Sequence, residues 1–217
     1  GHVDFSHEVR RSLMACEGAL IIVDASQGVE AQTVANLYLA LEYDLTLLPI
    51  INKIDLPSAD IERAQEAIDA ELGLDPFEAI PISAKNGIGI EDVLIGIVEK
   101  LPAPQGDPDA PLKALVFDAH FDTFRGVILQ VRVMEGTLKP RDTIHFMHAD
   151  RDFTVDEVGY KQMKLNLRKQ LSAGEVGYVV AGVKSVQDIE IGDTITHLNR
   201  QAEEPIPGYQ PARQVVF

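Results

Sequence analysis

The amino-acid sequence predicts an α/β domain with a parallel sheet, followed by a small β-barrel domain. In the first half, short apolar runs alternate with segments whose apolar residues recur every three or four positions. In the second half, short strand candidates follow one another, with glycines at or near their ends. A proline-rich stretch separates the two patterns. We therefore expect domains at 1–101 and 112–200, a linker at 102–111, and a tail or the start of a further domain at 201–217.

Four helices and three strands are predicted in the first half. The helices are expected at 5–13, 34–41, 61–72 and 90–101, and the strands at 19–24, 47–51 and 79–82. Continuous apolar strands that alternate with helices indicate a parallel sheet covered on both faces. Ligands of such sheets bind beyond the carboxyl ends of the strands, so the polar residues that follow each strand are the ones to examine.

Six strands are predicted in the second half, and regular turn signals between them favour a small barrel. They are expected at 112–119, 127–133, 143–147, 153–158, 176–181 and 194–196.

Composition and charge exclude several classes of protein. With 46% hydrophobic and 24% charged residues, the chain has the composition of an ordinary globular protein. No apolar run is long enough for a transmembrane segment, and no signal peptide opens the chain. A single cysteine, Cys16, cannot form an internal disulfide, so a protein of the reducing cytoplasm is expected. The net charge is −15, of which residues 1–101 carry −12 (six basic against eighteen acidic residues). This charge argues against sequence-blind binding to nucleic acid, DNA included.

The segment Asn52-Lys53-Ile54-Asp55 directly follows the second predicted strand. A carboxylate at position 55 can accept two hydrogen bonds from the N1–H and 2-amino group of guanine. The Asn52 amide can donate to N7, and the Lys53 stem can lie along the base plane. Adenine lacks the paired donors and would leave the carboxylate without partners. The alternative is an ordinary polar turn, which four residues do not exclude.

A second segment, Ser83-Ala84-Lys85, follows the third predicted strand. Its backbone N–H groups can meet the O6 atom of guanine. Between the two segments there is room for one helix and one strand, so neighbouring strand ends can present both to one base. Together they predict a guanine-nucleotide site.

Three further features are weaker candidates. The scattered histidines show no metal-ligand spacing; His145 and His148 are near neighbours without a third ligand, so we expect no metal site. Cys16 is expected to be a buried structural thiol. The cations of residues 161–169 form an acid-free run, interpreted either as a solvated loop or as a contact to RNA or ribosomal protein.

These motifs resemble those of GTPases of the translation-factor class. Asn52-Lys53-Ile54-Asp55 is similar to the guanine-specificity motif, and Ser83-Ala84-Lys85 to the motif that supports it. The opening Gly1-His2-Val3-Asp4-Phe5 resembles the segment that follows Asp-x-Pro in switch II. Residues 23–33, 52–57, 117–122 and 126–127 narrow the resemblance to the LepA (elongation factor 4) family, along essentially the whole chain.

The resemblance implies part of a GTPase-type parallel sheet followed by a translation-factor β-barrel. It implies GTP or GDP as ligand, with Mg²⁺, and a GTP hydrolase in which Gly1 meets the γ-phosphate and His2 orients the attacking water. It further implies the ribosome as partner, through ribosomal RNA and proteins and its tRNA-bearing complexes. The expected role is reverse movement of tRNAs or rescue of stalled ribosomes. A peripheral position at the inner face of the cell membrane is a further expectation.

The sequence departs from the family pattern because it contains no Gly-x-x-x-x-Gly-Lys-Ser/Thr phosphate loop. We therefore expect the carboxyl-terminal half of a GTPase domain plus the barrel, inactive by itself and active in a full-length parent. The alternatives are a non-catalytic module that binds nucleotide or ribosome, and part of another translational GTPase, such as an elongation or release factor.

Overall fold

The computed structural model describes residues 6–207. The chain divides into two compact units, Gly1–Ala103 and Pro104–Phe217. An α/β unit with a parallel sheet is followed by an antiparallel, barrel-like β unit, which confirms the fold class predicted from the sequence. No helix among the described residues is long and apolar enough to span a membrane.

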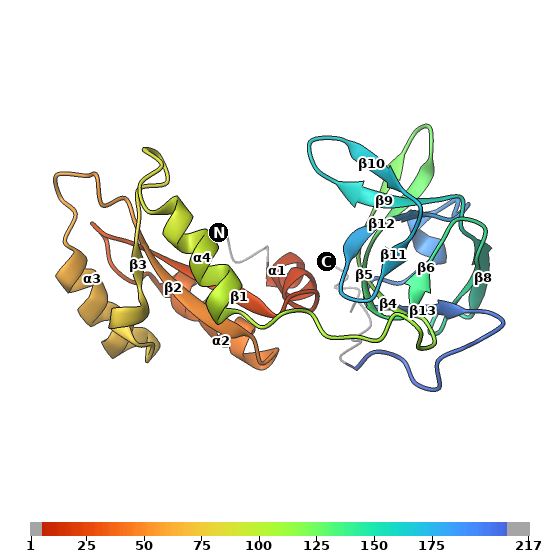
Figure 1. Ribbon diagram of the computed structural model, residues 1–217, viewed down its shortest axis with the longest axis horizontal. Helices are drawn as coiled ribbons and strands as arrows, with labels where there is room; N and C mark the ends of the chain where they lie inside the picture. The colour runs from red at the N-terminus through yellow and green to blue at the C-terminus, as the bar shows by residue number, and fades with distance from the viewer. Residues whose placement is uncertain (1–5, 208–217) are drawn as a thin grey trace, which may run out of the picture. The chain divides into compact units, whose positions relative to one another are not determined.

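The first unit alternates helices and strands, and its three strands pair in the order β1-β2-β3, all parallel (Figure 1). Every helix and strand predicted for this half is present, although the third helix continues as a π-helix and the third strand has only two residues. The elements are α1 (Ser6–Leu13), β1 (Gly18–Asp24), α2 (Ala31–Glu42), β2 (Thr46–Asn52), α3 (Ile61–Ala67), the π-helix η2 (Ile68–Leu72), the 3-10 helix η3 (Pro76–Glu78), β3 (Ile80–Pro81) and α4 (Ile90–Lys100).

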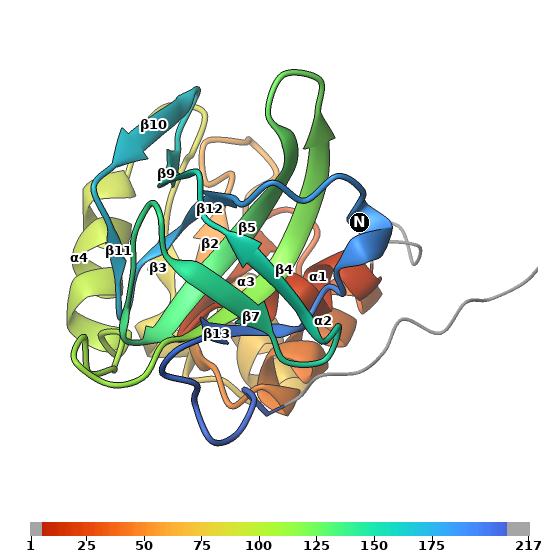
Figure 2. The same cartoon turned by 90° about the vertical axis from the view of Figure 1, so that its right-hand side faces the viewer.

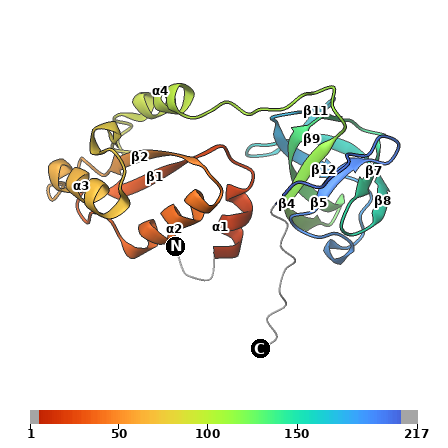
Figure 3. The same ribbon diagram turned by 90° about the horizontal axis from the view of Figure 1, so that it is seen from below.

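Strand β2 is the middle strand of this sheet, and both of its faces are covered. Leu48 and Ile50 pack with α4, whereas Ile51 packs with α2 and α3 on the other face. Figure 3 shows α4 on one side of the sheet and α2 on the other. On the edge strand β1 the predicted cover is incomplete, since Ile22 is 54% exposed. Cys16 is also exposed, contrary to the prediction, because it lies beyond the end of α1.

The second unit is an eight-stranded antiparallel sheet in the order β10-β9-β12-β5-β4-β13-β7-β8, with a short β11-β6 pair. Figure 2 shows the long paired strands β4 and β5 of this sheet. Its core consists of fully buried aliphatic side chains and Phe146. The elements are β4 (Lys113–Asp122), β5 (Gly126–Glu135), β6 (Thr137–Leu138), β7 (Thr143–Phe146), β8 (Arg151–Thr154), β9 (Glu157–Lys161), β10 (Leu165–Arg168), β11 (Leu171–Ser172), β12 (Val176–Val180), the 3-10 helix η4 (Val186–Asp188) and β13 (Thr194–His197).

Two predictions for this unit are wrong in detail. The strand expected at 153–158 is two strands, because Val155 N–H donates to Asp142 O and Asp156 N–H to Val180 O, outside the β7–β8 ladder. The run 161–169 belongs to the β9–β10 hairpin rather than to a loop. Short strands such as β10 lack a pattern of their own and form because a neighbouring strand supplies hydrogen-bond partners.

Gly159 allows the β9–β10 hairpin to pack on β12. A Cβ atom at this position would lie 2.1 Å from Asn166 O and 2.6 Å from Tyr178 Cε1. We expect Gly159→Ala to lower the free energy of unfolding by about 2–3 kcal/mol, because backbone or a buried ring must move. Chemical denaturation measures this decrease. Thr154→Ala, an exposed change on β8, should stay within about 0.5 kcal/mol; equal effects of the two changes would contradict the packing argument.

Candidate functional site

The carboxyl ends of the three parallel strands meet at one edge of the sheet. Asp24 at the end of β1 is the register partner of Asn52 at the end of β2. The segment after β3 is tied to this edge, because Ile82 N–H donates to Ile51 O at 2.7 Å and Ile54 N–H donates to Ile82 O at 3.2 Å. The two sequence motifs are thereby brought side by side.

Asn52 presents the donor end of its amide. Its Oδ1 atom accepts from Lys53 N–H at 2.7 Å and from Ala84 N–H at 3.1 Å. Both lone pairs of the carbonyl oxygen are thus occupied, which leaves the NH₂ group to donate elsewhere. An acceptor such as the N7 atom of a purine fits this group.

Asp55 is oriented by a buried hydroxyl. Ser83 is fully buried, and its Oγ atom donates to Asp55 Oδ1 at 2.7 Å while accepting from Asn86 N–H at 3.2 Å. The hydrogen bond from Ser83 holds the pKa of the Asp55 carboxyl below its ordinary value. The exposed carboxylate is therefore ionised at neutral pH, with capacity to accept further hydrogen bonds. Lys85 is exposed and acts on Asp55 through its charge alone, as a minor cause of the same shift.

Lys53 makes an ion pair that the sequence did not predict. Its Nζ atom lies 2.5 Å from Asp24 Oδ2, and Asp24 Oδ1 accepts from Ser26 N–H at 2.8 Å and Ser26 Oγ–H at 2.7 Å. The contact with Lys53, followed by those with Ser26, lowers the pKa of Asp24 to about 2. The signal for Asp24 was its position: like Asn52, it is the polar residue that ends an apolar parallel strand.

A pocket of about 220 Å³ opens beside this pair, at the ends of β1 and β2. Besides Asp24, Asn52 and Lys53, its lining consists of Ile22, Gln27, Gly28, Glu30 and Thr33. The lining combines two carboxylates, an ammonium group, two amides and a hydroxyl with one apolar side chain, whereas Asp55 and Ser83 do not line it.

Of the residues predicted for the site, the structure brings together Asn52, Lys53, Asp55, Ser83 and Ala84 and places Lys85 at the edge. Gly1 and His2 lie outside the described residues.

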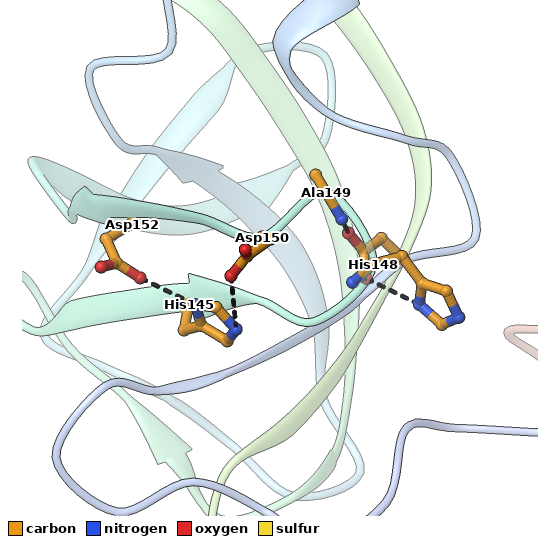
Figure 4. A network of polar contacts seen from close by, with 6 residues as sticks. His145, His148, Ala149, Asp150 and Asp152 are labelled. Carbon is orange, nitrogen blue, oxygen red and sulfur yellow. Dashed lines mark hydrogen bonds and ion pairs between the residues drawn. The ribbon is translucent and has the colours of Figure 1, made fainter.

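The two neighbouring histidines of the barrel contact different carboxylates (Figure 4). His145 Nδ1 lies 2.7 Å from Asp152 Oδ1, whereas His148 Nδ1 lies 3.1 Å from Oδ1 of the buried Asp193. The Asp193 carboxylate also accepts the backbone N–H groups of His148 and Ala149. The first pair thus links β7 to β8, and the second links the segment after β7 to the segment before β13. Among residues 6–207 no group of three His, Cys, Asp or Glu side chains is placed to hold a metal ion.

Comparisons with known protein families find a separate match in each of the two units. Residues 1–103 match the family described as the elongation factor Tu GTP binding domain, and residues 126–196 match elongation factor Tu domain 2. The chain is 81% identical over all 217 residues to Elongation factor 4 2 of Rhodopirellula baltica. It is 57% identical to Elongation factor 4 of Syntrophus aciditrophicus and 55% to that of Aquifex aeolicus, again over its full length. In each case it spans 36% of the relative, about a third of its length. The chain thus belongs to the elongation factor 4 (LepA) family.

Proposed function

We propose that the first unit of this chain forms the base-recognising part of a GTP site in a translational GTPase. The observation that carries the proposal is the placement of Asn52, Asp55 and Ser83 at one sheet edge. Asn52 offers a donor, and Asp55 an ionised acceptor whose orientation is fixed by Ser83. This set is complementary to N7 and to the N1–H and 2-amino group of guanine, and it leaves the edge of adenine without partners.

GTP hydrolysis itself belongs to the full-length protein. There the nucleotide loses its γ-phosphate to an in-line water, which His2 orients while the Gly1 amide contacts the phosphate. These two roles rest on the resemblance of residues 1–5 to switch II. Mg²⁺ would neutralise the charge that develops on the phosphates, but the described residues form no group of three His, Cys, Asp or Glu side chains that could hold a metal ion. No step of the proposal therefore passes through a metal held by these residues.

The ribosome is the partner that we infer for the full-length protein, with reverse movement of tRNAs or rescue of stalled ribosomes as its task. Two observations support this inference. The relatives carry the name elongation factor, and the second unit exposes an acid-free run of cations on the β9–β10 hairpin. A cytoplasmic location and a peripheral membrane position stay predictions.

Nucleotide binding by the 217-residue chain tests the base-recognition proposal. Most of the phosphate affinity of such sites comes from a glycine-rich loop, a helix N-terminus and Mg²⁺, and this sequence has no phosphate-loop motif. We therefore expect weak binding that is similar for GMP, GDP and GTP, unchanged by EDTA, and undetectable for ADP. Hydrolysis of GTP should not be measurable.

Isothermal titration calorimetry with GMP, GDP, GTP and ADP, with and without Mg²⁺, measures these affinities. IDP, which lacks the 2-amino group, should bind more weakly than GDP because it makes one hydrogen bond fewer to Asp55. Equal binding of ADP and GDP would contradict the assignment of the site. Magnesium-dependent, micromolar GTP binding would contradict the assignment of these residues to base recognition alone.

A further inference from the structure

Lys53 is held at both ends. Its backbone has a φ of +67°, a left-handed conformation that residues other than glycine rarely adopt. The side-chain Oδ1 atom of Asn52 fixes this backbone by accepting a hydrogen bond from the Lys53 N–H, and the Asp24 carboxylate holds the ammonium group. A lysine side chain has four rotatable bonds and would otherwise sample many rotamers. The two tethers stretch its apolar stem from the end of β2 toward the end of β1.

Asp24 is itself fixed. Its side chain is only 15% exposed, and the amide and hydroxyl of Ser26 both donate to Oδ1, which leaves Oδ2 for Lys53. The parallel register of β1 and β2 sets Asp24 beside Asn52, one residue before Lys53. With a pKa of about 2, the carboxylate stays ionised at any physiological pH. The pair is thus a fixed feature of the sheet edge.

We propose that Asp24 is a positioning residue for guanine recognition: it holds the Lys53 stem against the face of the base and does not itself touch the nucleotide. The inference rests on the proposed function. Asn52 and Asp55 contact the edge of the base and leave its face open. An extended lysine stem supplies an apolar strip for that face, and a stem already in place loses little rotamer freedom on binding.

A double-mutant cycle on nucleotide affinity in the full-length protein tests this role. Asp24→Asn keeps the shape of the side chain and an acceptor oxygen for Ser26 but removes the charge that holds Lys53. Lys53→Met keeps a linear apolar stem without the ammonium group. We expect Asp24→Asn to weaken GDP and GMP binding by the same factor, about three- to tenfold, and to have no further effect in the Lys53→Met background. Ser26→Ala should act in the same direction by a smaller factor, because it loosens Asp24 without removing a charge.

Two results of the calorimetric titrations would overturn the proposal. One is an equal decrease in affinity for Asp24→Asn in both backgrounds, which would show that Asp24 does not act through Lys53. The other is unchanged affinity in both Asp24→Asn and Ser26→Ala. Asp55→Asn, measured alongside, separates a failure of the proposed function from a failure of the positioning role. If Asp55→Asn also leaves GDP affinity unchanged, the proposed function fails. If Asp55→Asn abolishes GDP binding while Asp24→Asn and Ser26→Ala leave it unchanged, only the positioning role of Asp24 fails.

Discussion

Replacing Asp55 by asparagine in the full-length protein is expected to weaken GTP and GDP binding by at least about a hundredfold and to favour xanthosine nucleotides. The carboxylate can accept hydrogen bonds from both the N1–H and the 2-amino group of guanine. The amide of an asparagine instead points its NH₂ donor at one of these two donors, so that hydrogen bond is lost. Ser83 donates to Oδ1 at 2.7 Å, so the asparagine oxygen should stay on that side and its NH₂ group should replace Oδ2. Xanthine carries a 2-oxo group that accepts from this NH₂.

Calorimetry of GDP and XDP with the wild type and the variant measures both halves of this prediction. Asp44→Asn is the matched control, because Asp44 is exposed, precedes β2 at the opposite end of the strand, and has a φ of +54° that asparagine tolerates. It removes the same charge without touching the site, and GDP affinity should not change. Equal GDP affinity in wild type and Asp55→Asn would refute the role of Asp55 in base recognition.

Removing the cations of the β9–β10 hairpin is expected to weaken ribosome binding by about ten- to a hundredfold near 0.1 M salt. Residues 161–164 and 167–170 are exposed, and Leu167 at 68% and Met163 at 101% add apolar surface. The Arg168 guanidinium lies 4.9 Å from the centre of the Tyr160 ring, a stacking contact that leaves the edges of the guanidinium able to donate. No acidic residue occurs between Glu157 and Glu175, and Glu157 itself pairs with Arg125, so no carboxylate interrupts the run of cations. The substitutions are Lys161→Gln, Lys164→Gln, Arg168→Gln and Lys169→Gln.

The informative measurement is the salt dependence of co-sedimentation with ribosomes. Each phosphate that a removed cation no longer neutralises should reduce the slope of log affinity against log salt by about one, hence by up to about four in total. GTP affinity off the ribosome should stay the same, because the nucleotide site belongs to the other unit. A control with the same charge change replaces four exposed cations elsewhere in the barrel, namely Lys139, Arg141, Lys184 and Arg200. If hairpin and control variants have the same salt slope as the wild type, the hairpin is a solvated surface element.

Much of the first unit could be predicted from the sequence because its signals are local. The central run of β2, residues 47–51, is buried on both faces and apolar at every position, and a helix such as α4 carries the 3.6-residue period of one buried face. The polar residues that end the strands then mark the ligand edge. In this way the order of the elements and the motifs around Asn52 and Ser83 were available from the sequence alone.

The wrong predictions for the second unit share one physical cause, which is that partners distant in the sequence decide where its strands form. Residues 161–169 became part of a hairpin because β9 and β12 supply the neighbouring ladder, although Leu165 and Leu167 alone form too short an alternation to predict a strand. Gly159 is likewise required by the close approach of Asn166 and Tyr178, which no local pattern reveals.

Residue patterns along the chain were sufficient to predict the fold class and the alternation of strands and helices, and they pointed to the residues that we propose for guanine recognition. How those residues are held became visible in the folded protein: Ser83 against Asp55, Ala84 against Asn52, and Asp24 against Lys53. Each of these pairs joins positions 28 or more residues apart, and the pairing register of β1, β2 and β3 brings them together. The type of residue determines which hydrogen bonds a side chain can donate or accept, whereas the register of the parallel sheet determines which partner it contacts.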